Sequence, residues 1–329
     1  MQTRAVRILH PGGPEVLQLG SIDLADPKPG EVRIAVAAAG LNRADCLQRR
    51  GVYPAPPGVP PDVPGLEYAG VIDACGEGVD PNRTGQRVMG ITGGGAMAGH
   101  LHVDVRECLP VPDGMSLTDA AAIPEAFVTA FDALVLQGDM RAGDQVLLHA
   151  VGSGVGTAAL QLVNAWNATG IGTSRTPEKL ARSEALGLTH SVHIGGDGFA
   201  SALKELGGAD VILDTIGAKY LKDNLRSLRT GGRMVVIGLL GGVAGELNLG
   251  ALLRKRATIH GSVLRSRSLE EKVALAAAFS AQVLPHFETR ILRPVVDAVL
   301  PMAEVRQAHE RMEAGDTFGK IVLRWSHDE

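Results

Sequence analysis

The residues of this sequence best placed to do chemistry form a glycine-rich turn near the middle of the chain. Gly152, Ser153, Gly154 and Val155 follow the apolar run 146–148 and precede the apolar segment 157–163. A strand that turns through glycines into a helix leaves backbone N–H groups and the positive end of the helix dipole pointing outward. Glycine clusters also form ordinary tight turns, but the strand before and the helix after favour a phosphate site. We therefore expect a dinucleotide to bind here.

The residues after the next predicted strand indicate which dinucleotide binds. About 20 residues beyond the first glycine, an NAD site carries an acidic residue for the ribose 2′-hydroxyl. This sequence instead has Ser174 and Arg175 there, and Lys179 follows in the first turn of the next helix. A hydroxyl and two cations suit a 2′-phosphate, although solvated surface charges are the alternative interpretation. Because an acid is missing and cations are present, the sequence favours NADPH.

Composition and charge are typical of a metabolic enzyme. The 329 residues are 45% hydrophobic and 21% charged, with a net charge of −4, so the chain lacks the positive field that attracts nucleic acid or anionic membranes. The three cysteines are widely spaced and fit neither a disulfide framework nor a zinc ribbon. No apolar run resembles a signal peptide or is long enough to cross a bilayer. We expect a cytoplasmic protein with no membrane or nucleic-acid partner.

The order of predicted elements divides the chain into three parts. Residues 1 to about 120 alternate short β-rich runs with Gly/Pro turns, which indicates a small, mostly antiparallel barrel or sandwich. An Ala-rich helix or helix pair is expected over 116–136, a capping box at Ser268 and a last strand at 321–323. Between 145 and 264 strands alternate with helices, which predicts a doubly wound parallel sheet and an α/β fold. The strands expected there are 146–150, 170–174, 191–194, 210–216, 234–239 and 258–264.

Seven motifs together resemble those of one known family. They occupy residues 41–45, 51–58, 64–67, 120–127, 153–159, 264–267 and 319–323. On these motifs the whole chain resembles the medium-chain dehydrogenase/reductase superfamily, in particular its zinc-independent quinone oxidoreductases. The resemblance implies a GroES-like catalytic domain built from 1–122 and 266–329, a Rossmann domain over 123–265 that binds the coenzyme, and a homodimer.

Zinc-dependent members of that superfamily differ from this sequence at the metal ligands. They place a cysteine where this chain has Asn42 and a histidine where it has Leu66, and they carry a cysteine-rich lobe that this sequence lacks. A tetrahedral Zn²⁺ needs thiolate, imidazole or carboxylate ligands, and leucine supplies none. His100 and His102 are the nearest remaining candidates, but two partly exposed strand histidines are the commoner interpretation. We therefore expect no metal site.

Without zinc, the acceptor has to tolerate incoming charge with the help of neutral hydrogen-bond donors. Charge entering a quinone or a conjugated enone spreads over the π-system, whereas a simple carbonyl concentrates it on one oxygen. Asn42 and Tyr53 are the candidate donors, on loops that the resemblance places over the nicotinamide, and Asp45 is expected to orient Asn42. Packing of the Tyr53 ring on prolines and an ordinary helix N-terminal acid at Asp45 are the alternatives. Thr129 matches a family position beside the nicotinamide and phosphates, although mid-helix threonines are often bystanders.

These observations predict an NADPH-dependent reductase that transfers hydride to a small-molecule quinone or quinone-like acceptor. Two alternatives stay open: a reductase of 2-alkenal or enone double bonds, and a non-catalytic NADPH-binding protein such as a redox sensor. Arg265 and Arg267 either contact the substrate or the dimer partner, or form a charged turn after Leu264. The sequence does not separate these roles.

Overall fold

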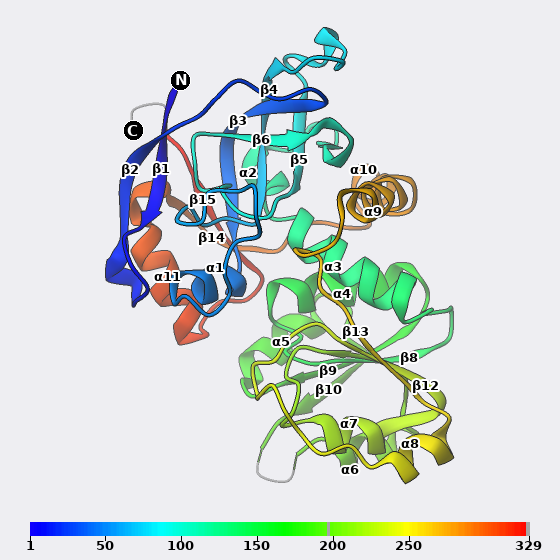
Figure 1. The fold of residues 1–329 in the computed structure, drawn as a ribbon. Coiled ribbons are helices and arrows are strands. Elements are labelled where there is room, and N and C mark those ends of the chain that lie inside the picture. The colour runs from blue at the N-terminus through cyan, green and yellow to red at the C-terminus, as the bar shows by residue number, and fades with distance from the viewer. Residues whose placement is uncertain (196–197, 327–329) are drawn as a thin grey trace. The chain divides into compact units, whose positions relative to one another are not determined.

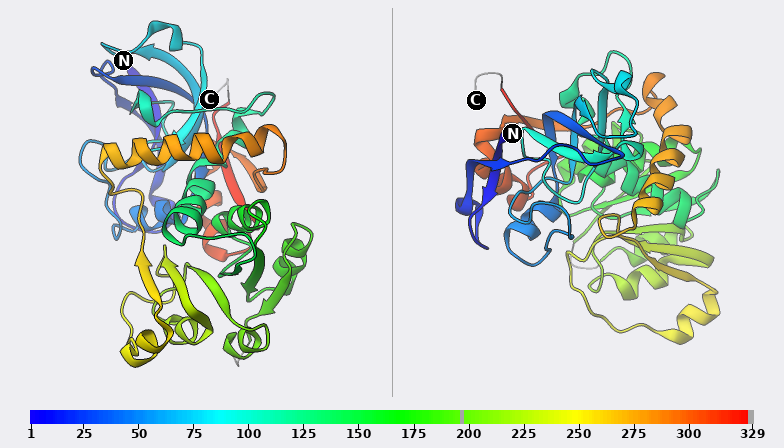
Figure 2. Two further views of the ribbon diagram at one scale, coloured as in Figure 1. Left: turned by 90° about the vertical axis from the view of Figure 1, so that its right-hand side faces the viewer. Right: turned by 45° about the horizontal axis from the view of Figure 1, so that its top comes forward.

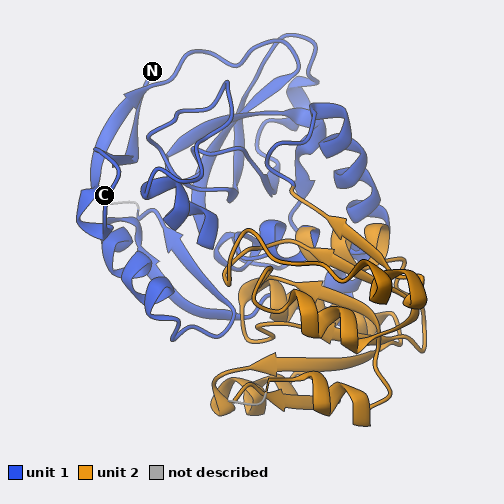
Figure 3. Cartoon of the chain, turned by 60° about the horizontal axis from the view of Figure 1, so that its bottom comes forward, with its two compact units in different colours: residues 1–128, 264–329 blue, residues 129–263 orange. Residues whose placement is uncertain are grey.

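The chain folds into two compact units, and the structure, a computed structural model, describes residues 1–195 and 198–326. Unit 1 comprises Met1–Val128 and Leu264–Glu329, and unit 2 comprises Thr129–Val263 (Figure 3). Unit 2 is thus inserted into the sequence of unit 1. The two ends of the chain consequently have to fold together in one unit.

Unit 2 contains a parallel sheet, which confirms the doubly wound prediction. Its strands lie in the order β10-β9-β8-β11-β12-β13. β12 begins earlier than expected, because Leu228 pairs with Ala209 across a register shift between β11 and β12. The strands are β8 Gln145–Leu148, β9 Thr169–Ser174, β10 His190–His193, β11 Ala209–Asp214, β12 Leu228–Val236 and β13 Thr258–Gly261.

Helices cover both faces of this sheet, as a buried parallel sheet requires (Figure 1). α4 and α5 lie on one face, and α6, α7 and α8 lie on the other. On the second face, Leu203 of α6, its N-cap Phe199 and Leu225 of α7 pack in one apolar cluster with Leu147 and Ile212 of the sheet. The helices are α4 Gly154–Ala165, α5 Pro177–Glu184, α6 Ala200–Glu205, α7 Leu221–Ser227 and α8 Leu249–Lys255.

Unit 1 is built on a mostly antiparallel sheet, as its β-rich runs and Gly/Pro turns predict. The strand order is β14-β15-β3-β4-β5-β7, with β6 paired to β3, and a separate hairpin joins β1 to β2. β15 near the C-terminus pairs with β3 near the N-terminus, Ile321 opposite Leu41. The strands are β1 Gln2–Ile8, β2 Leu17–Asp23, β3 Glu31–Leu41, β4 Glu67–Cys75, β5 Arg87–Ile91, β6 His100–Asp104, β7 Leu109–Pro110, β14 Val296–Pro301 and β15 Lys320–Arg324.

The longer helices of unit 1 begin where the local sequence predicts. Ser268 and Glu271 form the expected capping box at the start of α9, which α10 follows closely (Figure 2). Val305 and Ala308 of α11 are buried against the sheet. The helices are α1 Arg43–Arg49, α9 Leu269–Gln282, α10 Leu284–Glu288 and α11 Val305–Ala314, with short 3₁₀ helices at Pro14–Val16, Pro81–Arg83, Val105–Glu107 and Met302–Glu304.

The Ala-rich segment differs from the regular helix pair that we expected. It forms α2 Leu117–Ala120, a π-helical stretch Pro124–Val128, α3 Thr129–Phe131 and a second π-helical stretch Asp132–Gln137. Pro124 has no N–H to donate, so a continuous α-helical hydrogen-bond ladder from α2 is interrupted there. The wider turns that follow are of the kind found as bulges at functional sites.

Among the described residues, no helix has the length and apolar character needed to cross a bilayer. The three cysteines are free thiols, which agrees with the absence of a disulfide pattern in the sequence.

Candidate active site

Asp45 connects the start of α1 to the end of the loop that precedes β4. Its Oδ2 accepts a hydrogen bond from the Asn42 backbone N–H at 2.8 Å, and its Oδ1 accepts one from the Gly65 N–H at 2.9 Å. The residue is fully buried, and burial raises its pKa to about 6 against the opposing effect of these two bonds. Asp45 therefore contacts Asn42 through the backbone N–H and not through the side-chain amide, and its orienting role stays a prediction.

The Asn42 side chain is held on all sides within unit 1. Its Nδ2 donates to Glu67 Oε1 at 2.9 Å and to the Gly40 carbonyl at 3.3 Å, while its Oδ1 accepts from Lys320 Nζ at 2.6 Å. Both amide protons are thereby used inside the protein. In this arrangement Asn42 organises its neighbours, and neither proton is spare for an acceptor molecule.

A buried ion pair that we did not predict lies beside Asn42. Lys320 Nζ is 2.5 Å from Glu67 Oε1 and also donates to the Leu41 carbonyl at 2.8 Å. Lys320 is 4% exposed and Glu67 is fully buried. A Cβ on Gly40 would overlap Glu67 Oε1, so glycine is required at that position for the pair to form. Both ionic residues lie in motifs that carry the family resemblance, but no local spacing connects them.

Glu125 is a second residue that sequence reasoning missed. Its backbone N–H donates to Glu67 Oε2 at 2.8 Å, which places it next to the ion pair. Burial and then the negative charge of Glu67 raise the pKa of Glu125 to about 8, with Lys320 acting in the opposite direction. Lys320 cannot neutralise both acids, because its ammonium is bound to Glu67. Glu125 is therefore protonated at neutral pH.

Tyr53 lies half-buried in the proline-rich loop after α1. Its ring faces a cation, with the Arg265 Cζ 4.7 Å from the ring centroid. Burial raises the pKa of the phenol, and the Arg265 charge opposes that rise. The ring is thus held by an arginine as well as by its loop.

The glycine turn of unit 2 has the geometry expected of a phosphate site. The Ser153 side chain accepts a hydrogen bond from the Gly156 N–H at 3.0 Å and caps α4. Ala150 has a left-handed φ of 50°, and a Cβ on Gly156 would lie 2.5 Å from the Ala150 carbonyl oxygen. The turn is therefore tight. Its residues Gly152, Ser153, Gly154 and Val155 form the N-terminal end of the twelve-residue helix α4, where backbone N–H groups can bind a phosphate.

The residues expected to recognise the 2′-phosphate lie at the end of β9. Ser174 is its last residue, and its Oγ accepts a hydrogen bond from the Thr176 N–H at 3.0 Å. Arg175 follows and is exposed, and Lys179 is half-buried in the first turn of α5. Ser174 ends β9, and Arg175 and Lys179 follow it. Because β9 is the neighbour of β8 and the carboxyl ends of parallel strands share one edge, these residues lie at the same edge of the sheet as the glycine turn.

Two hydroxyls in unit 2 are buried and unsatisfied, as groups that bind a ligand can be in its absence. Thr129 Oγ1, at the predicted coenzyme position, and Thr215 Oγ1, just after β11, are buried without a hydrogen-bond partner in the described structure. Buried polar atoms are normally satisfied, so a ligand that supplies partners would remove a cost. The residues present thus fit a dinucleotide. Thr215 belongs to no sequence motif that we recognised. Only its position directly after the central strand β11 could have indicated it as a coenzyme contact.

A catalytic zinc does not fit the residues of unit 1. Leu66 is 2% exposed and offers no ligand atom, and Asn42 Oδ1 is already bonded to the Lys320 ammonium. His100 Nδ1 is 2.9 Å from Thr3 Oγ1, and its Nε2 is 3.4 Å from Asp73 Oδ2. Throughout residues 1–195 and 198–326, no cluster of three or more His, Cys, Asp or Glu side chains is arranged to hold a metal ion.

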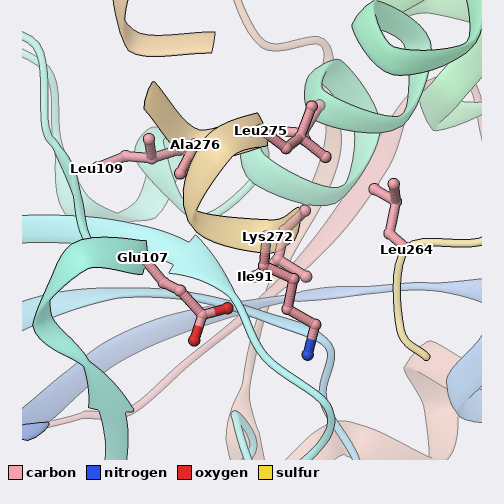
Figure 4. Close-up of a pocket in the computed structure, with 8 residues that line it drawn as sticks. Ile91, Glu107, Leu109, Leu264, Lys272, Leu275 and Ala276 are labelled. Atoms are coloured by element: carbon pink, nitrogen blue, oxygen red, sulfur yellow. The ribbon is translucent and has the colours of Figure 1, made fainter. Parts of the chain in front are cut away.

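A small pocket in unit 1 is lined by other residues than these (Figure 4). It is lined mainly by apolar side chains, with Glu107 and Lys272 as its ionic members. It contains none of the predicted catalytic residues, and we assign it no role in the reaction. Its lining consists of Ile91, Glu107, Leu109, Val128, Leu264, Lys272, Leu275 and Ala276.

Comparisons with known proteins identify the family. Residues 28–113 match the alcohol dehydrogenase GroES-like domain, and residues 154–280 match the zinc-binding dehydrogenases. The quinone oxidoreductase of Lama guanicoe is 35% identical over 328 residues, which cover 97% of this chain and 97% of that protein. The chain therefore belongs to the medium-chain dehydrogenase/reductase superfamily, and it is an oxidoreductase whose relatives imply a nicotinamide coenzyme.

Solved structures agree on the fold and differ in activity. An NAD-dependent alcohol dehydrogenase has a TM-score of 0.86 and 32% identity, covering 98% of this chain and 100% of that chain. The CurK enoyl reductase has a TM-score of 0.87 and 25% identity, covering 99% of each chain. The α/β fold class, with a GroES-like unit and a Rossmann-type sheet, is confirmed.

The raised pKa of Glu125 predicts a pH-dependent stability difference for Glu125→Gln. The folded protein holds this proton up to about pH 8, whereas an ordinary glutamate loses it near 4.5. The stability that Glu125 contributes therefore falls as pH rises between those values, and glutamine does not titrate. The melting temperature of the wild type should fall relative to that of Glu125→Gln from about pH 5 to about pH 8. Exposed Glu310→Gln on α11 is the control, and parallel curves for wild type and Glu125→Gln would refute the assignment.

Proposed function

We propose that this protein is an NADPH-dependent quinone oxidoreductase that works without zinc. The observation that carries the proposal is that Asn42, the position where the resemblance places a cysteine ligand of zinc, is bonded instead to the Lys320 ammonium, which also pairs with Glu67. A site without a Lewis acid suits an acceptor that disperses incoming charge over its own π-system. The similarity to quinone oxidoreductases over the full chain supports the same acceptor class.

The residues of unit 2 supply the coenzyme contacts in this proposal. The backbone N–H groups of the turn Gly152–Val155 bind the pyrophosphate, and Ser174, Arg175 and Lys179 bind the 2′-phosphate. The Thr129 hydroxyl, buried without a partner, hydrogen-bonds the coenzyme. Bound NADPH would supply the hydride.

The residues of unit 1 bind the acceptor and position the group that binds it. Tyr53 donates a hydrogen bond to the acceptor oxygen, because Arg265 can only donate to the phenol oxygen and does not accept the phenol proton. Asn42 and Asp45 hold the start of α1 and the end of the Tyr53 loop in place. All three predicted residues thus keep a role, with Asn42 as a positioning residue.

Replacing both Arg175 and Lys179 by alanine tests the coenzyme preference. If both cations contact the 2′-phosphate, the double variant should bind NADPH more weakly by about 1–3 kcal/mol and NADH almost unchanged. Calorimetric titration with each coenzyme measures the difference. Arg324→Ala, an exposed cation in unit 1, is the control. An equal loss for NADPH and NADH would show that the cations do not read the phosphate.

An assay with two acceptor classes tests the reaction itself. Quinones should be reduced faster than 2-alkenals, and the rate should survive dialysis against a chelator because no residue pattern fits zinc. The CurK similarity favours double-bond reduction as the second candidate. Faster turnover of alkenals would establish that candidate instead. Coenzyme binding without turnover of either class would indicate a non-catalytic protein.

Unit 2 also supports the homodimer that the resemblance implies. β13 stands at one end of the parallel sheet, and edge strands tend to pair with another chain. Val243, Leu249 and Leu253 in the preceding segment are 83%, 68% and 76% exposed. Light scattering should show a dimer for the wild type and a smaller particle for Leu253→Glu. Leu9→Glu, an exposed leucine of unit 1, should stay dimeric, and a monomeric wild type would contradict the proposal.

A further inference from the structure

Arg265 is a buried arginine that joins three separate segments of unit 1. It is 7% exposed, although it lies only two residues after the end of unit 2. Its Nε donates to the Gly93 carbonyl at 2.7 Å, its Nη1 to the Tyr53 carbonyl at 3.1 Å and its Nη2 to Gln48 Oε1 at 2.6 Å. Residues 264–267 form the turn that the sequence offered as one alternative, closed by the Arg267 N–H and the Leu264 carbonyl at 3.1 Å, and within this turn the Arg265 side chain is buried.

Gln48 extends this contact to the far end of the Tyr53 loop. From α1 its Nε2 donates to the Pro61 carbonyl at 3.1 Å and approaches the Val63 carbonyl at 3.5 Å. Arg265 holds the Gln48 oxygen, and it also holds the Tyr53 carbonyl near the start of the same loop. The Arg265–Gln48 pair thus ties both ends of the loop 51–66 to α1.

Tyr53 is the first of the groups that stabilise the charge of Arg265, ahead of the carboxyl groups of Asp45 and Glu125. In the part of the chain that the structure describes, its hydrogen-bond acceptors are all uncharged oxygens. Its guanidinium instead covers the Tyr53 ring, with 4.7 Å from Cζ to the ring centroid. Burial disfavours this cation, and no carboxylate among the described residues forms an ion pair with it, so a neutral side chain could make the same backbone contacts at lower cost.

The position of Arg265 over the ring also affects the pKa of the Tyr53 phenol. The charged groups that face Tyr53 are Arg265 and Glu125, and they have opposite effects. The Arg265 cation lowers the pKa of Tyr53, and ionised Glu125 would raise it. Because Glu125 holds its proton at neutral pH, the arginine is the charge that Tyr53 experiences there.

We propose that Arg265 is the positioning residue of Tyr53: it fixes the loop backbone, covers one face of the ring and provides the positive charge beside the phenol. The inference rests on the proposed function, because it assigns Arg265 to the residue that donates to the acceptor. An Arg-to-Lys change keeps the charge but loses the planar fork that reaches three segments at once. Arg265→Gln removes both.

The experiment compares Arg265→Gln, Arg265→Lys and Tyr53→Phe with the Tyr53→Phe/Arg265→Gln double variant. Arg265→Gln should lower kcat by about tenfold to 100-fold, as expected for a misplaced catalytic group, while the Kd for NADPH stays within about twofold. In the Tyr53→Phe background the same substitution should cost little further kcat. Arg324→Gln, an exposed arginine of unit 1, is the matched control.

Two readouts do not depend on turnover. Hydrogen exchange of residues 52–66 should be faster in Arg265→Gln and intermediate in Arg265→Lys. Ultraviolet difference titration against the Tyr53→Phe variants should show Tyr53 ionising at higher pH in Arg265→Gln, because the opposing cation is gone. If the Gln variant does not fold, Arg265→Lys and Gln48→Met carry the same tests.

The outcomes separate the two proposals. If Arg265→Gln lowers kcat equally in the wild-type and Tyr53→Phe backgrounds, or leaves loop exchange and Tyr53 ionisation unchanged, the positioning role is overturned. A wild type that reduces neither quinones nor alkenals would overturn the proposed function alone, since exchange and titration still report on the Arg265 contact.

Discussion

The buried Lys320–Glu67 ion pair is the interaction on which the organisation of unit 1 depends. Taking two charges out of water costs several kcal/mol per ion unless every polar atom finds a partner. Here Glu67 also accepts from the Asn42 amide and the Glu125 N–H, and Lys320 also donates to the Leu41 carbonyl and to Asn42 Oδ1. The pair is complete only when β15 lies against β3 and β4 lies beside it, so it forms only after both ends of the chain have met.

The same pair determines the charge state of its neighbours. Three acids, Asp45, Glu67 and Glu125, share one ammonium, and the ammonium is bonded to Glu67. Glu125, beside the Glu67 carboxylate, therefore keeps its proton. An uncharged acid next to a half-buried phenol gives a region that can tolerate negative charge arriving from outside, which is what reduction of a quinone requires.

The two units reach their chemistry by different physical routes. In unit 2 the site follows from backbone geometry: a tight turn at Ala150, a glycine at 156 with no room for a Cβ and a serine cap on α4. Any sequence with these features in this order presents the same N–H groups. In unit 1 the site follows from side chains that reach across strands, and their roles are set by burial and by partners. The turn at Ala150 and the close contact at Gly156 can be predicted from the residues around them. The buried network of Asn42, Glu67 and Lys320 cannot, because its members are far apart in the sequence.

The sequence by itself determined the elements and their order. Apolar periodicity and turn residues indicated all six parallel strands, the capping box at Ser268 and the glycine turn, because each depends on neighbours within a few residues. Only the tertiary structure determined that the Arg265 side chain is buried, that Glu67 pairs with Lys320 and that Asn42 donates both amide protons to acceptors within the protein. It also decided the π-helical turns around Thr129. Those features arise from contacts between residues far apart in the chain. The register of the sheet determines which of these residues are in contact, and exclusion of water determines which of their ionisable groups stay charged.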